Sequence, residues 1–162
     1  MKFSKIVLSV LCVFICAFSF SQNKDFSGTW KFAEQESISG KLYSNGSPKS
    51  FKITQAANQT IIEQTTAGAN GDVTTSSTLS FDGKATETKT STGRKKLITL
   101  TWNGTAGYTT VTATYDAADQ NKLVFKTTDI YTIDDKGLVL QRKAENFMNG
   151  EVWESKAYYD KQ

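Results

Sequence analysis

Phe26-Ser27-Gly28-Thr29-Trp30 opens the first of a long series of segments in which apolar and polar side chains alternate. The alternation continues almost to the C-terminus, in a chain rich in threonine, valine, isoleucine and aromatic residues, which suit the half-buried surface of a β-sheet. No window of 11 residues or more carries the i, i+3, i+4, i+7 apolar spacing of an amphipathic helix. The sequence therefore predicts an all-β protein.

Glycine, asparagine and aspartate separate the predicted strands, because the chain contains one proline. Asp82-Gly83, Asn103-Gly104 and Asn149-Gly150 have the composition of β-hairpin turns. Segment 85–92 is almost wholly polar, so we expect an edge strand there. The polar stretch 37–49 contains Asn45-Gly46-Ser47-Pro48 and predicts a surface loop.

About eight to ten short strands with hairpin-like links favour an antiparallel up-and-down β-barrel. Parallel strands would need crossovers of about a dozen residues or more, for which these links leave no room. Closing the sheet also removes exposed edges, which are a liability for strands that carry little charge. A two-sheet β-sandwich is the alternative architecture.

The opening stretch resembles the first motif of the lipocalin family, and most of all the short bacterial lipocalin-like domains that begin with Phe-Ser-Gly-Thr-Trp-Lys. In that family the tryptophan closes one end of the barrel beneath an arginine from a late strand. The resemblance therefore implies that Gly28, Trp30 and Arg142 close the barrel, with Arg142 stacked on the Trp30 indole. Thr128-Asp129 is a faint counterpart of the family's second motif.

The ten-strand count is also similar to that of fatty-acid-binding proteins. Those proteins carry a helix-turn-helix lid after the first strand, and the polar stretch 37–49 offers no counterpart to it. Full-length lipocalins carry a helix before the C-terminus, and the corresponding part of this chain is strand-like. The resemblance thus implies a lipocalin-like barrel.

Residues 1–21 have the pattern of a secretory signal peptide. Lys2 and Lys5 precede an apolar run over 6–18, and Ser19-Phe20-Ser21 supplies small residues for cleavage near Ser21. The run is shorter than the about 20 residues of a membrane-spanning helix, which makes a retained anchor the weaker alternative. We expect an exported protein, periplasmic or extracellular, whose residues 22–162 form one domain without stable membrane insertion.

Removal of that leader changes both the charge and the thiol content. Residues 22–162 carry 17 basic and 16 acidic side chains, which is no basis for binding nucleic acid. Cys12 and Cys16 both leave with the leader. The exported protein is thus expected to contain no disulfide, although its compartment would permit one.

The chain contains no histidine, which removes the commonest general acid–base residue and the commonest metal ligand. Carboxylate pairs such as Glu34 with Glu36, or Glu145 with Glu151, could in principle meet at a barrel mouth. Dispersed acidic side chains are most often solvated surface charge, and we assign them that role. The sequence predicts no enzyme, no metal site and no cofactor.

The barrel interior is the remaining place for a function. Six large side chains are expected to face inward, and four smaller polar ones to lie among them. The six are Phe51, Leu79, Trp102, Phe125, Tyr131 and Trp153, and the four are Thr75, Ser77, Thr127 and Asp129. An apolar cavity with a few polar groups is the usual form of a small-molecule site.

Two functions follow from that interior. The first is binding of a small hydrophobic or amphipathic ligand in the barrel. In the alternative the same aromatic side chains fill the barrel, and the protein binds a protein partner, for example as an inhibitor, through its loops or outer face. The sequence does not identify the ligand or the partner.

Overall fold

The computed structural model of the chain describes residues 24–90, 92–104 and 106–162, and all regular structure within these ranges is β-strand. The ten strands are β1 (Gly28–Ser39), β2 (Ser50–Gln55), β3 (Gln59–Gly68), β4 (Gly71–Ser80), β5 (Thr86–Lys89), β6 (Lys95–Trp102), β7 (Gly107–Tyr115), β8 (Leu123–Ile133), β9 (Leu138–Asn146) and β10 (Glu151–Lys161). The predicted signal peptide, residues 1–21, lies outside the described residues.

Every strand pairs antiparallel with its neighbour, in the order β4-β3-β2-β1-β10-β9-β8-β7-β6-β5. All consecutive strands are neighbours except β4 and β5, and the first strand, β1, pairs with the last, β10. The chain therefore forms a nearly closed up-and-down barrel. The predicted fold class is confirmed.

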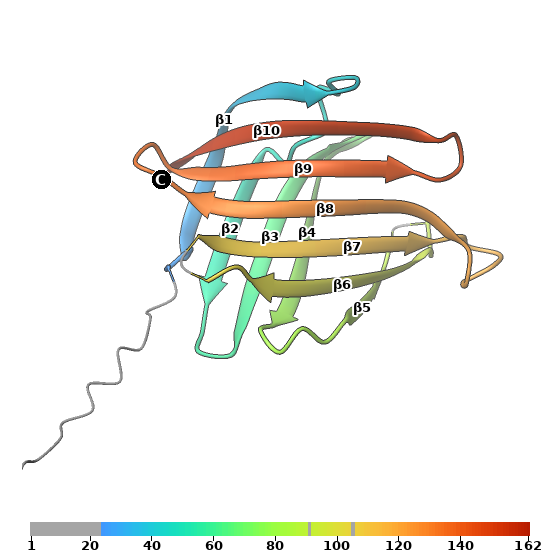
Figure 1. Cartoon of the computed structure of the whole chain (residues 1–162), viewed down its shortest axis with the longest axis horizontal. Helices are drawn as coiled ribbons and strands as arrows, with labels where there is room; N and C mark the ends of the chain where they lie inside the picture. The colour runs from blue at the N-terminus through green and yellow to red at the C-terminus, as the bar shows by residue number, and fades with distance from the viewer. Residues whose placement is uncertain (1–23, 91, 105) are drawn as a thin grey trace, which may run out of the picture.

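The barrel is built like two crossed sheets that share β1. In Figure 1, β2, β3 and β4 run behind β6 to β10 and cross them steeply. The first part of β1 pairs with β2, and its pairing with β10 is interrupted by bulges at Phe32/Glu34 and Ser37/Ser39. Bulges bend a strand and increase its local twist, which lets β1 serve both halves.

The opening in the barrel lies between β4 and β5, where the sequence predicts a hairpin. That prediction is wrong: Asp82-Gly83 makes a turn, with Gly83 at φ 76°, but no ladder joins the two strands. The side-chain hydroxyl of Thr86 donates a 3.0 Å hydrogen bond to the Thr78 carbonyl across this seam. β5 pairs only with β6, in agreement with the predicted edge strand.

Aromatic side chains fill one end of the barrel. Phe26, from the segment before β1, is fully buried and packs edge-on against Tyr108 at a centroid distance of 4.7 Å. Tyr108 stacks on Tyr131, and Phe51 contacts both Tyr131 and Tyr159. Each such aromatic pair contributes about 0.5–1.5 kcal/mol beyond burial of its area, so this end of the barrel is a packed core.

Trp30 lies in that core, but Arg142 does not stack on it. The Trp30 indole donates a 2.9 Å hydrogen bond to the Phe26 carbonyl, and the Lys161 ammonium lies 5.3 Å from its ring centroid. Lys161 is the β10 neighbour of Trp30, and this register places its ammonium near the ring. Arg142 instead binds Asp129, and the implied Arg142–Trp30 contact is wrong.

Gly107 is required where β7 begins. Its φ is 150°, and a Cβ atom there would stand 1.9 Å from the Tyr131 carbonyl oxygen of β8. Gly104, three residues earlier, has φ 65° but no heavy atom within 4 Å of the corresponding position. Gly107 is therefore required both by its backbone conformation and by lack of space, whereas Gly104 is required by its backbone conformation alone.

We predict that Gly107→Ala destabilises the protein by about 3 kcal/mol or more, because strain and a backbone clash add. Gly104→Ala should cost only about 1–2 kcal/mol, the usual penalty of a left-handed residue. Urea unfolding followed by tryptophan fluorescence measures both. Equal costs for the two variants would show that β7 and β8 do not approach as closely as the structure has them.

Candidate ligand-binding site

The end of the barrel opposite Phe26 is covered by the connection between β1 and β2, residues 40–49. Within it Ser47 and Pro48 are buried, and the Tyr159 hydroxyl donates a 3.0 Å hydrogen bond to the Pro48 carbonyl. The prediction of a surface loop is therefore wrong for this part of the segment. A buried backbone carbonyl needs a hydrogen-bond donor, and the Tyr159 hydroxyl provides it.

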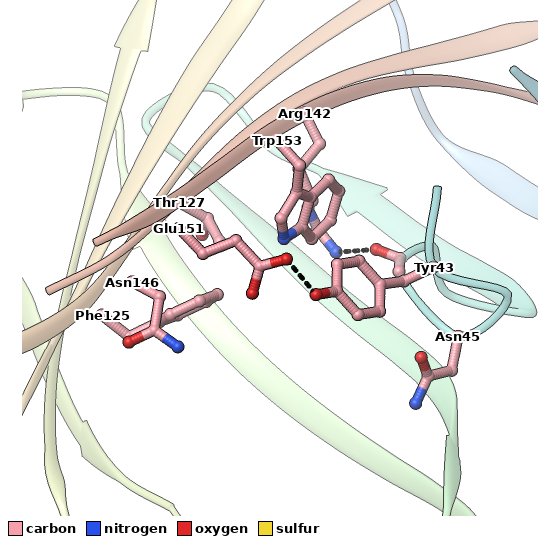
Figure 2. Close-up of a pocket in the computed structure, with 9 residues that line it drawn as sticks. Tyr43, Asn45, Phe125, Thr127, Arg142, Asn146, Glu151 and Trp153 are labelled. Carbon is pink, nitrogen blue, oxygen red and sulfur yellow. Dashed lines mark hydrogen bonds between the residues drawn. The ribbon is translucent and has the colours of Figure 1, made fainter. Parts of the chain in front are cut away.

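A cavity of about 370 Å³ lies beneath this segment. Its walls come from the segment itself and from β8, β9 and β10: Tyr43, Asn45, Gly46, Phe125, Thr127, Arg142, Asn146, Glu151 and Trp153. Figure 2 shows Phe125 and Asn146 on one side and Tyr43 and Asn45, from the covering segment, on the other. The volume falls at the low end of the about 300–1,000 Å³ found for small-molecule sites.

Tyr43 joins the covering segment to the barrel. Its ring packs against Trp153 with a centroid distance of 5.6 Å, and its hydroxyl donates a hydrogen bond to the Glu151 carboxylate. The Gln35 amide donates a 2.9 Å hydrogen bond to the Tyr43 carbonyl. The hydrogen bond to Glu151 raises the pKa of the Tyr43 phenol, which stays a neutral donor. These contacts hold Tyr43 over the mouth of the cavity.

Arg142 forms the polar part of the cavity wall. Its Nε and Nη2 atoms donate to the two carboxylate oxygens of Asp129, at 2.7 and 2.6 Å. Its Nη1 atom donates to the carbonyl oxygen of Gly46, at 2.6 Å. One guanidinium therefore joins β8, β9 and the covering segment (Figure 2 labels Arg142 near Tyr43 of that segment).

The Arg142–Asp129 pair is largely removed from water, with side-chain exposures of 14% and 6%. Burial opposes the charge on Arg142, but the adjacent Asp129 carboxylate outweighs it and raises the pKa of the guanidinium. Burial and the same carboxylate also raise the pKa of Tyr131, so its phenol remains protonated. The interior is thus polar at this point, but the positive charge of Arg142 is balanced by the negative charge of Asp129, as burial of an ion pair requires.

The structure divides the six predicted interior residues into three groups. Phe51 belongs to the packed core, and Trp102 packs against that core. Leu79 and Tyr131 are core residues that also border a second, much smaller cavity. Only Phe125 and Trp153 line the larger cavity.

The four predicted polar residues are also separated. Asp129 is buried in the ion pair, Thr127 lines the larger cavity and Ser77 the smaller one. Thr75 is exposed, because β4 is the unpaired edge of the sheet. Gly28 has φ 142° and stands where a Cβ atom would meet the Lys161 side chain, so its place beside Trp30 is structural.

Sequence reasoning missed the residues that the covering segment contributes, Tyr43, Asn45 and Gly46, since no local pattern shows that a polar loop folds inward. It also missed Lys96. The alternation that places Ile98, Leu100 and Trp102 on the inner face of β6 puts Lys96 on that face as well, and this signal was available.

Within the described residues, no group of three or more cysteine, aspartate and glutamate side chains is arranged to hold a metal ion. The same part of the chain contains no helix long and apolar enough to cross a bilayer.

No protein-family model matches the sequence, and no curated protein sequence matches it. Solved structures do share its fold. The Schistosoma mansoni fatty acid binding protein in complex with arachidonic acid has a TM-score of 0.50 at 15% identity, over 85% of this chain and 96% of that one. As-p18, an extracellular fatty acid binding protein, has a TM-score of 0.51 at 19% identity, with the same coverages. The chain thus shares the antiparallel β-barrel fold of these proteins.

We predict that Arg142→Met destabilises the protein by about 3–5 kcal/mol, because the Asp129 carboxylate is left buried without its partner. The double variant Asp129→Leu, Arg142→Met should be more stable than the single one, since no charge remains buried. Chemical unfolding measures both, with Arg94→Met as a control of equal charge change. If the double variant is less stable than Arg142→Met, the cost of burying an unpaired charge does not determine the effect of these substitutions.

Proposed function

We propose that the protein binds one small amphipathic molecule in the cavity beneath residues 40–49. The observation that carries this proposal is the composition of the cavity wall. Phe125 and Trp153 present ring faces to an apolar body, while Thr127, Asn146 and the Arg142 guanidinium offer hydrogen-bond partners for a polar end. The proteins that share the fold are named for binding fatty acids, which agrees with a binding role for the barrel.

The size of the cavity limits the ligand. Because the opposite end of the barrel is filled by the aromatic core, a ligand cannot occupy the full length of the interior. Its volume of about 370 Å³ suits a compact molecule or a short chain. The proposed role is binding or transport, without chemistry on the ligand.

We further propose that the protein is exported, on the strength of the signal-peptide pattern in residues 1–21. An exported carrier would meet its ligand outside the cytoplasm. Both proposals can be tested on one sample of the protein purified from cells that express the full chain.

Native mass spectrometry of that sample should give a polypeptide beginning at Gln22 together with an additional small mass. The added mass is expected to dissociate on gentle activation, as a non-covalent ligand does. A polypeptide that retains residues 1–21 would contradict export. A bare polypeptide that also fails to bind any member of an amphiphile library would contradict ligand binding.

Blocking the cavity gives a second test. Thr127→Phe places a large ring inside the cavity and should weaken ligand binding about tenfold or more, a loss of at least about 1.4 kcal/mol. Thr128→Phe, the next residue of β8, points outward and serves as the matched control, because Thr127 and Thr128 pair with Ala144 and Lys143 on opposite faces. Titration with a fluorescent amphiphile measures both affinities. Equal binding by the two variants would place the ligand elsewhere.

A second candidate function, binding of a protein partner, is favoured by the rim of the same cavity. Five exposed apolar side chains lie on the end of β1, the covering segment, the β9–β10 turn and the start of β10: Ile38, Leu42, Phe147, Met148 and Val152. A partner held there would appear in the native spectrum as a protein mass in fixed ratio, lost in the variant Phe147→Asp.

A further inference from the structure

A second, smaller cavity lies inside the barrel behind the unpaired edge of β4. It has a volume of about 40 Å³ and is lined by Ile62, Gln64, Ser77, Leu79, Lys96, Ile98, Thr110 and Tyr131. These residues come from β3 and β4 on one side of the seam and from β6, β7 and β8 on the other. None of them lines the larger cavity beneath residues 40–49.

Five of the lining side chains are polar, and their hydrogen-bonding groups are unused. Among the described residues, no side-chain hydrogen bond is made by Gln64, Ser77, Lys96, Thr110 or Tyr131, and no ion pair includes Lys96. Thr110 and Tyr131 are at most 4% exposed. Their hydroxyls are therefore available to accept or donate a hydrogen bond to a group that enters the cavity.

The charge around this cavity is positive. Lys96 is the one ionised side chain in its wall, because the Tyr131 phenol is kept neutral and no carboxylate lines it. The nearest acid, Asp129, already binds Arg142 through both oxygens. Burial and repulsion by Arg142 lower the pKa of Lys96, with Asp129 opposing them only in part. A cation in such a place attracts an anion.

We propose that this cavity is a second binding site, which takes a carboxylate group between the Lys96 ammonium and the hydroxyls of Thr110 and Tyr131. The volume admits about three water-sized groups, which matches a carboxylate and is small for a phosphate or sulfate. Ile62, Leu79 and Ile98 supply apolar surface for the carbon atoms attached to it. The seam between β4 and β5, where no ladder closes the sheet, is the route of entry.

This site is independent of the function proposed for the larger cavity. The carboxylate can belong to a small free acid or to the head of an acyl chain, since both present the same group to Lys96. Short and longer carboxylates distinguish the two sources. A matched uncharged molecule shows whether the negative charge is what the site recognises.

The test measures the affinity of butyrate, octanoate and 1-octanol by calorimetry, with the amide NMR signals of Ser77 and Thr110 reporting the place of binding. Lys96→Met should weaken carboxylate binding about tenfold or more, the usual consequence of losing a charged hydrogen bond. Lys95→Met removes the same charge from the outer face of the same strand and should have no effect. Lys96→Gln keeps a polar side chain at this position. It therefore shows whether a loss of binding in Lys96→Met comes from the missing charge or from altered packing.

The pH dependence supplies a readout that packing alone would not produce. Because burial lowers the pKa of Lys96 below the ordinary 10.5, carboxylate affinity should begin to fall at a lower pH than an exposed lysine would give. The fall should be absent in Lys96→Met. Affinity that rises with chain length indicates an acyl chain, and equal affinities indicate a small free acid.

Four outcomes of these carboxylate-binding measurements would each overturn the proposal. They are unchanged carboxylate binding in Lys96→Met, equal losses in the Lys95 and Lys96 variants, octanol bound as tightly as octanoate, and no binding of any carboxylate, which would leave water as the occupant. Octanoate binding that Thr127→Phe abolishes and Lys96→Met spares would also overturn it, while supporting the larger cavity as the ligand site.

Discussion

The end of the barrel that holds the larger cavity depends on the hydrogen bonds of the Arg142 guanidinium. It binds the Asp129 carboxylate through two nitrogens and the Gly46 carbonyl through a third. Taking such a pair out of water is costly unless every partner is in place. The covering segment therefore contributes to the stability of the ion pair, and the ion pair in turn positions the covering segment over the larger cavity.

The two ends of the barrel differ in the side chains that occupy their interior. At the end closed by Phe26, interlocked aromatic rings exclude any ligand and stabilise the fold. The larger cavity lies at the other end, and the smaller one borders the core, where threonine, serine and lysine side chains replace apolar ones. Within the described residues, the aromatic end thus supplies the largest side chains of the core.

The seam between β4 and β5 gives the barrel a second point of access. Elsewhere each strand is paired on both sides, so ladder hydrogen bonds close the wall. At the seam, within the part of the chain that the structure describes, one side-chain hydrogen bond crosses the gap, from the Thr86 hydroxyl to the Thr78 carbonyl. The covered mouth lies beside the larger cavity and the seam beside the smaller one. Each cavity therefore has its own opening.

The sequence alone determined the strand pattern, most of the turns and the inward faces of β6, β8 and β10, because period-two alternation and turn residues are local properties. It could not show that Asp82-Gly83 joins strands that never pair, since pairing depends on where the rest of the sheet closes. Nor could it show that Trp30 meets Lys161 rather than Arg142, or that residues 40–49 fold inward onto Arg142. Those contacts join residues far apart in the chain, and only the tertiary structure, which sets the register of β1 against β10 and carries the segment over the mouth, decided them.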